Sequence, residues 1–243
     1  MKLIFLSILL CSLAASAQID IPAGTILPVQ LNSSLNSRKS KPGQRITARI
    51  MQDVPLPSGR KIPAGAKLKG HVEAVKAASQ GQGGQITLRF DQLKFAHQTI
   101  PITTTLRALA SMMEVEDAQT PPTGPDRGTP WAWATRNLIG GEVAYGEGGP
   151  VDRGTEQVGR ALADGVLAPV RANTQRGCPD GGGTQPQALW VFSSDACGVY
   201  GLDEVKISHA GRTRPIGVVT LTSKEGAINI RSGSGLLLRV LAP

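Results

Sequence analysis

The chain has 243 residues, 40% of them hydrophobic, and its 26 Lys and Arg against 18 Asp and Glu give a formal net charge of +8 at pH 7. This hydrophobic fraction suffices for a packed core, and the length allows one large or two small domains. No segment approaches the roughly 20 consecutive apolar residues of a membrane-spanning helix, so we expect no transmembrane span in the mature form.

Residues 1–17 have the three parts of a secretory signal: a positive start, an apolar stretch and a small-residue cleavage site, here Lys2, Leu3–Leu13 and Ala15-Ser16-Ala17. We expect cleavage between Ala17 and Gln18. The sequence therefore predicts an exported protein that is periplasmic, outer-membrane-associated or extracellular. A lipoprotein signal with Cys11 as the lipidated residue is the weaker alternative, because Leu10 stands where such signals have a small residue.

Removal of the signal leaves two cysteines, Cys178 and Cys197, in an oxidising compartment. We therefore predict a disulfide between them, which would stabilise the fold by roughly 3 kcal/mol in the chain-entropy model. The alternatives are two free thiols and, less favoured still, a metal site, since neither a Cys-x-x-Cys motif nor clustered histidines accompany the pair.

A basic exported protein is expected to meet anionic partners, and lipid head groups, cell-wall polymers and nucleic acid all have the right charge. Net charge alone does not choose among them. Basic residues are mostly scattered along the chain, with one local concentration at Arg38, Lys39, Lys41 and Arg45. We interpret that concentration as a solvated loop rather than a binding patch.

The tetrapeptide Ile-Pro-Ala-Gly occurs at Ile21–Gly24 and again at Ile62–Gly65. With proline at the second position and glycine at the last, each copy predicts a β-turn that begins a strand. Apolar and polar residues alternate after both turns, and the first third of the chain predicts strands at residues 27–31, 46–50, 68–74 and 86–90 and around Ile100–Ile102. Pro28 suggests an edge position for the first of these strands.

The middle of the chain is less regular. Leu106–Val115 is apolar and contains helix formers, and residues 116–130 are rich in proline. Trp131–Leu138 and Thr155–Leu167 are candidate helices, the latter because Val158, Ala161 and Leu162 recur at helical spacing.

Strand patterns return at residues 188–192, 205–207, 216–222, 227–230 and 236–240. We therefore predict a mainly β fold, an antiparallel distorted barrel or sandwich with an irregular, partly helical insertion. The expected divisions are a signal at 1–17, a β module at 18–105, the insertion at 106–186 and a C-terminal β segment at 187–243 that completes or packs on the β domain.

We predict no catalytic, cofactor-binding or metal-binding residues. Nothing in the sequence brings Ser193, Ser194 and Asp195 within reach of His209, and these serines are interpreted as turn residues. His71, His97 and His209 lack the spacing of a helical zinc site, and the glycine runs 146–149 and 181–183 lack a phosphate-binding pattern. Trp131 and Trp133 could contact a sugar or a partner, although packing against the sheet is the commoner role.

Five segments of the first third together resemble the TrbI-like family of periplasmic, outer-membrane-directed core components of conjugation and type IV secretion machines: Ile21–Thr25, Pro42-Gly43, Thr47–Val54, Ile62–Gly70 and Gly84–Leu93. The resemblance covers about Ile21–Ile102. It implies a distorted β-barrel whose members assemble into rings, sometimes with a helical insertion that reaches toward the membrane, a place that residues 106–167 could take. The family offers no catalytic residues.

The leading functional hypothesis is a non-enzymatic, exported cell-envelope protein that binds or assembles with partners. Expected partners are envelope proteins, anionic cell-wall or outer-membrane components, or further copies of the chain. The alternatives are an exported hydrolase of cell-wall polymers, suggested by Trp131, Trp133 and His209, and a nucleic-acid-binding envelope protein, which is less favoured.

Overall fold

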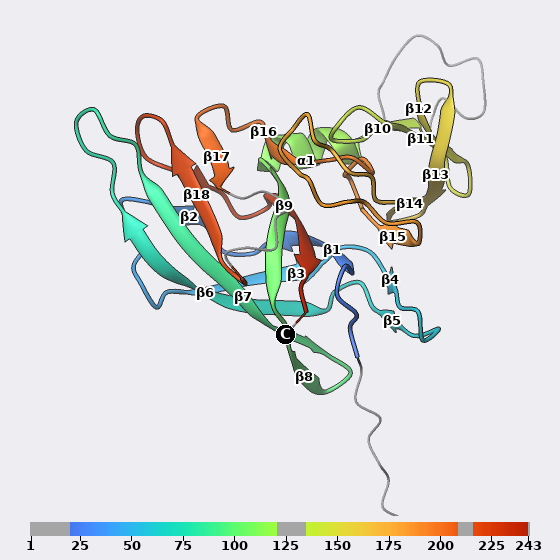
Figure 1. Cartoon of the computed structure of the whole chain (residues 1–243), viewed down its shortest axis with the longest axis horizontal. Helices are drawn as coiled ribbons and strands as arrows, with labels where there is room; N and C mark the ends of the chain where they lie inside the picture. The colour runs from blue at the N-terminus through green and yellow to red at the C-terminus, as the bar shows by residue number, and fades with distance from the viewer. Residues whose placement is uncertain (1–19, 121–134, 209–215, 243) are drawn as a thin grey trace, which may run out of the picture.

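The computed structural model describes residues 20–120, 135–208 and 216–242. This part of the chain is mainly β, as predicted, and is built from two large sheets and two small ones (Figure 1). Among the described residues no sheet closes into a barrel, because the two ends of the larger sheet are short strands that do not pair with each other. Of the two expected architectures, the fold is therefore the sandwich-like one.

The first sheet has ten strands, of which β8 (Gln98–Pro101) pairs only with β7. All its pairs are antiparallel except that of β16 with β9. The other nine strands run in the order β16 (Gly198–Tyr200), β9 (Thr104–Ala110), β20 (Gly235–Val240), β1 (Ile26–Leu31), β3 (Arg45–Ile50), β6 (Lys67–Lys76), β7 (Gln85–Phe95), β18 (Val219–Ser223) and β17 (Val205–Ser208).

The second sheet is an antiparallel meander that follows chain order: β10 (Thr135–Asn137), β11 (Val143–Tyr145), β12 (Pro150–Arg153), β13 (Glu156–Leu162), β14 (Gly165–Pro169) and β15 (Pro186–Ala188). Two short pairs complete the β structure, β2 (Leu35–Asn36) with β19 (Asn229–Ile230) and β4 (Val54–Pro55) with β5 (Lys61–Ile62). The helix α1 (Met112–Gln119) follows β9.

The middle segment contains less helix than expected. Thr155–Leu167 was predicted as a candidate helix, and this is wrong: it forms β13 and β14. The pairing of β12 with β13 shifts register next to Val158, so Val158 and Ala161 both point inward although they are three residues apart. A bulge of this kind inserts one residue and so imitates helical spacing.

The other helical candidates differ from the structure in part. Within Trp131–Leu138, Thr135–Asn137 is strand β10, and Trp131–Ala134 lies outside the described residues. Within Leu106–Val115, the first five residues belong to β9, and α1 begins at Met112. Ser111 caps that helix by accepting a hydrogen bond from the Glu114 N–H, the usual role of serine at this position.

Both Ile-Pro-Ala-Gly copies form turns that begin strands, but with a different register from the predicted one. The Thr25 N–H donates to Pro22 O and the Ala66 N–H to Pro63 O, so each proline is the first residue of its turn. Gly24 and Gly65 occupy the third position with φ of +91° and +84°. That position of a type II turn requires positive φ, which explains the glycines.

Pro28 does not mark an edge strand, because β1 lies between β20 and β3. The β1–β3 ladder runs only from Val29 to Leu31, and Pro28 precedes it. Its carbonyl still accepts from the Met51 N–H, at 3.0 Å. The N–H that proline lacks is therefore lost at the end of the ladder, where it costs little.

Two apolar cores lie on opposite sides of three central strands. Strands β1, β9 and β20 are buried almost throughout, since one of their faces packs into the core of the first sheet and the other packs against the second sheet and α1. In contrast, β3 has the burial pattern of a strand with one buried and one exposed face, and β6 and β7 follow it over most of their length. The second sheet thus leaves the outer face of β3, β6 and β7 uncovered.

Candidate anion-binding face

Strand register brings basic side chains together on the uncovered face of β3, β6 and β7, which we call the basic face. Residues directly opposite one another form three cross-strand rows, each with one residue from each strand: Arg49–Lys67–Lys94, Thr47–Lys69–Gln92 and Arg45–His71–Arg89. Neighbouring strands lie about 4.8 Å apart and alternate residues about 6.7 Å apart, so these rows form a compact two-dimensional array.

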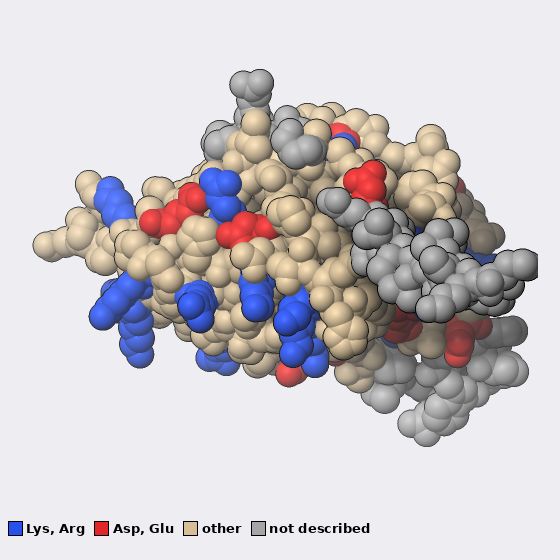
Figure 2. Space-filling view, turned by 90° about the horizontal axis from the view of Figure 1, so that it is seen from below, with Lys and Arg blue, Asp and Glu red and all other residues tan. Residues whose placement is uncertain are grey.

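The basic face carries six Lys and Arg against two carboxylates, an excess of four positive charges with His71 neutral. The carboxylates are Asp91, which lies 3.1 Å from His71 Nδ1, and Glu73, which accepts from Arg89 at 2.7 Å. Within the described chain, the other five cations have no carboxylate within 4.0 Å. Figure 2 shows a row of basic side chains along this side of the molecule.

The row Arg49–Lys67–Lys94 places three like charges directly opposite one another. Such pairs destabilise a sheet by up to about 1 kcal/mol each, and a threonine, as at position 47, would avoid this cost. Residues that break a local rule for stability tend to lie at functional sites. The row is therefore the strongest indication of function on this face.

The turn before β6 is held by Asp53, which helps to fix the position of Lys67 and Lys69. Its carboxylate accepts a hydrogen bond from Lys61 Nζ and another, of 2.8 Å, from the Ala64 N–H. These two bonds hold the pKa of the Asp53 carboxyl below its ordinary value of 3.8. The Asp53 bond to Ala64 N–H restrains the second Ile-Pro-Ala-Gly turn at the point where β6 begins.

The candidate catalytic serines have structural partners. Ser193 Oγ accepts from the Glu142 N–H at 3.1 Å, and Ser194 Oγ donates to Glu142 Oε1 at 2.6 Å. The Glu142 side chain is 1% exposed, and Arg153 donates to it at 2.7 Å. Ser194 lies in a turn, as predicted, and Ser193 directly precedes that turn. These serines thus stabilise a buried glutamate. His209 lies outside the described residues.

The structure separates the other predicted candidates. His71 lies on β6 within the basic face, whereas His97 is exposed in the turn between β7 and β8. In the part of the chain that the structure describes, no three His, Cys, Asp or Glu gather as a metal site would need. Cys11, the cleavage site at Ala17 and Gln18, Trp131 and Trp133 all fall outside the described residues.

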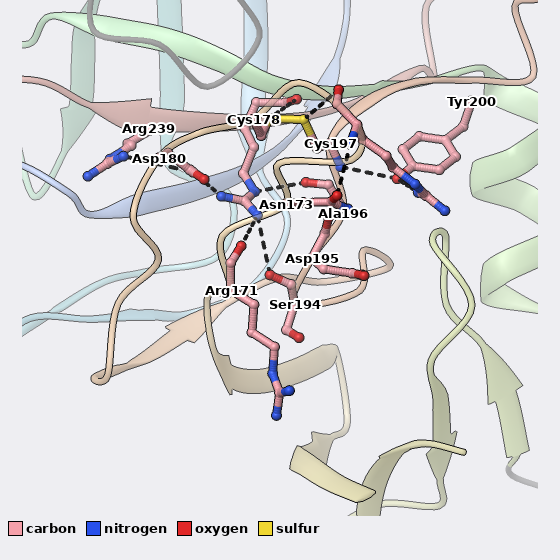
Figure 3. Close-up of a disulfide and its surroundings, with 12 residues drawn as sticks. Arg171, Asn173, Cys178, Asp180, Ser194, Asp195, Ala196, Cys197, Tyr200 and Arg239 are labelled. Carbon is pink, nitrogen blue, oxygen red and sulfur yellow. Dashed lines mark hydrogen bonds and ion pairs between the residues drawn. A yellow bond between two sulfur atoms is a disulfide. The ribbon is translucent and has the colours of Figure 1, made fainter.

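The disulfide between Cys178 and Cys197 is present, as predicted, with the two Cα atoms 5.9 Å apart (Figure 3). Tyr200 lies beside it, and its hydroxyl accepts from the Cys197 N–H at 3.1 Å. Burial raises the pKa of Tyr200. Phe192 packs in the second core.

Next to the disulfide lies a fully buried arginine that the sequence analysis missed. The Arg107 guanidinium is 0% exposed and forms an ion pair with Asp180, whose side chain is 1% exposed. It also donates to Ala196 O at 2.8 Å and Arg171 O at 2.5 Å. These bonds attach the segment between β14 and β15 to β9 and so complement the disulfide.

The single helix of the described residues has eight residues and is too short to cross a membrane. No protein-family model matches this chain, and none of the curated proteins compared with it matches significantly. Functional inference therefore depends on the geometry of the basic face and its surroundings.

Proposed function

We propose that this chain is an exported, non-enzymatic envelope protein that binds an anionic membrane surface through the basic face of β3, β6 and β7. The observation that carries the proposal is the row Arg49–Lys67–Lys94, three opposed cations that weaken the sheet and have no carboxylate partner within it. An anionic partner would supply the missing counter-charges.

The shape of the array favours a surface over a single strand of polymer. The cations come from three adjacent strands and therefore spread in two dimensions, as the head groups of a lipid layer do. Each Lys or Arg close to an anionic membrane contributes about 1 kcal/mol of attraction. Five such residues without carboxylate partners can thus hold the protein at the membrane without insertion.

Nucleic acid is a poorer partner for this face. Sheets that bind single-stranded nucleic acids stack the bases on aromatic side chains. The outward residues in the three rows are Arg, Lys, Thr, Gln and one His, and no Phe, Tyr or Trp stands among them. The predicted signal and the resemblance of residues 21–102 to TrbI-like proteins also favour an envelope location.

Co-sedimentation with vesicles tests the proposal. Protein that begins at Gln18 should sediment with phosphatidylglycerol-rich vesicles at low salt, be released at about 1 M salt where the Debye length is about 3 Å, and ignore phosphatidylcholine vesicles. Parallel arms with single-stranded DNA and with purified peptidoglycan test the alternatives. Equal binding to neutral vesicles, or a clear preference for DNA or peptidoglycan, would reject the membrane proposal.

A further inference from the structure

A pocket of about 310 Å³ lies where the first Ile-Pro-Ala-Gly turn meets the segment before β15. Its walls are Pro22–Ile26, Pro55, Pro57, Val170 and the backbone-rich stretch Gly182–Gln185, and Asp180 and Arg239 supply its charge. The volume is at the lower end of the range for small-molecule sites, and the combination of apolar walls with a few polar groups is typical of them.

Arg239 is a cation of this pocket that makes few polar contacts with the described residues. Its side chain is 24% exposed, and its only ionic contact in the described chain is Asp180 Oδ2, 3.8 Å from Arg239 Nη1. No hydrogen bond from its guanidinium is formed to a described residue, although the group has five N–H donors. Figure 3 shows Arg239 beside Asp180, which also forms the ion pair with Arg107.

The charge balance of this trio favours an anion in the pocket. Asp180 is already the ion-pair partner of the fully buried Arg107, so two guanidiniums share one carboxylate. The positive charge in excess is therefore presented by Arg239, the member of the trio that is accessible. A carboxylate can pair with an arginine through two parallel hydrogen bonds, and such charge-assisted bonds are among the strongest.

The other two members of the trio are enclosed. Asp180 Oδ1 is buried and accepts no hydrogen bond from the residues that the structure describes, and the Arg107 side chain is 0% exposed. Arg239 is therefore the charged group of the trio that a ligand can reach. The fitting ligand carries a carboxylate for Arg239 and a small apolar group for the proline-lined walls.

We propose that this pocket binds a small carboxylate with an apolar side chain, either a free acid or the C-terminal residue of a peptide. The ligand carboxylate pairs with Arg239, and its side chain contacts the apolar wall. The proposal uses no residue of the basic face and does not depend on the proposed membrane binding.

The pocket wall is held in place before any ligand arrives. The disulfide fixes Cys178 two residues from Asp180, and the Gly183 N–H donates to Val170 O at 2.6 Å. Gly182 has φ of +68°, and an added Cβ would lie 2.8 Å from Val170 O, so this position requires glycine. A preorganised site loses little affinity to ordering on binding.

Calorimetric titration of the protein that begins at Gln18 tests this proposal with acetyl-alanyl-alanine as the probe. The acid should bind, and the same dipeptide with a C-terminal amide should bind about 10-fold to 100-fold more weakly, since a charge-assisted hydrogen bond contributes about 1.5–3 kcal/mol. Acetyl-alanine in a parallel arm distinguishes the two sources: a free amino acid derivative predicts equal affinity, a peptide terminus predicts weaker binding.

Arg239→Gln should weaken binding of the acid to the level of the amide. The matched control is Arg160→Gln, which removes an exposed arginine of β13 in the second sheet and should leave the affinity unchanged. Equal affinities for acid and amide, no binding of the acid, or unchanged binding by a folded Arg239→Gln protein would overturn the assignment. The comparison of acid with amide uses the unmodified protein and holds even if the variant does not fold.

Discussion

Lys67→Glu should make the protein more stable. Lys67 lies on β6 directly between Arg49 on β3 and Lys94 on β7, so it takes part in two repulsive cross-strand pairs. Glutamate converts both into attractive pairs. Cross-strand charge pairs contribute from about 0.2 kcal/mol upward in either direction, and exposure favours the low end, so two reversals should add about 1 kcal/mol to the free energy of unfolding.

Urea unfolding at low and at about 1 M salt measures this effect. The gain should be present at low salt and mostly disappear at high salt, where the Debye length is about 3 Å. Lys206→Glu is the matched control, because Lys206 is exposed on β17 and lies opposite Thr222 rather than a cation. The free energy of unfolding of this variant should differ from that of the parent by less than about 0.5 kcal/mol. If Lys67→Glu is no more stable than the parent at low salt, the three-cation row does not carry the cost that marks it as functional.

Three further predictions concern residues that stabilise the fold around the two candidate sites. Asp180→Ala leaves Arg107 buried without its counter-ion and should cost about 3–5 kcal/mol in chemical unfolding; a loss below about 1 kcal/mol would contradict the pairing. The double cysteine-to-alanine variant should lose about 3 kcal/mol, and a melting point equal to that of the oxidised parent would show that the bond is not structural. Because the pKa of Asp53 is lowered on folding, the contribution of Asp53 to stability is complete above the unfolded pKa of 3.8 and is lost as pH falls through the folded pKa. The Asp53→Asn variant should therefore have a lower free energy of unfolding than the parent at neutral pH, and this free energy should fall less steeply in the variant as the pH becomes acidic. If the free energy of unfolding falls equally steeply in both proteins, Asp53 does not stabilise the fold through its charge.

Strands β3, β6 and β7 could be predicted from the sequence because each has one buried and one exposed face over most of its length. The alternation of polar and apolar residues in Lys67-Leu68-Lys69 reflects these two environments, and β3, β6 and β7 include the segments that this pattern predicts as strands. The second sheet was harder to predict: its strands are short, and a register shift in β13 produced apparent helical spacing.

The candidate sites depend on contacts between distant segments. Arg49, Lys67 and Lys94 are separated by 18 and 27 positions, and only the register of three strands brings them into one row. The buried pair of Arg107 and Asp180 joins residues 73 positions apart. Neither grouping leaves a local motif, so the sequence showed scattered basic residues where the fold forms a continuous basic face.

The affinity of the triple variant Arg49→Gln/Lys67→Gln/Lys94→Gln for phosphatidylglycerol-rich vesicles tests the central claim most directly. At about 1 kcal/mol for each cation near the surface, the loss of one complete row should weaken binding by about 3 kcal/mol, or about 100-fold, while the fold remains intact or becomes more stable. Binding by the folded triple variant that equals that of the parent would contradict the claim that the basic face is the membrane-binding surface.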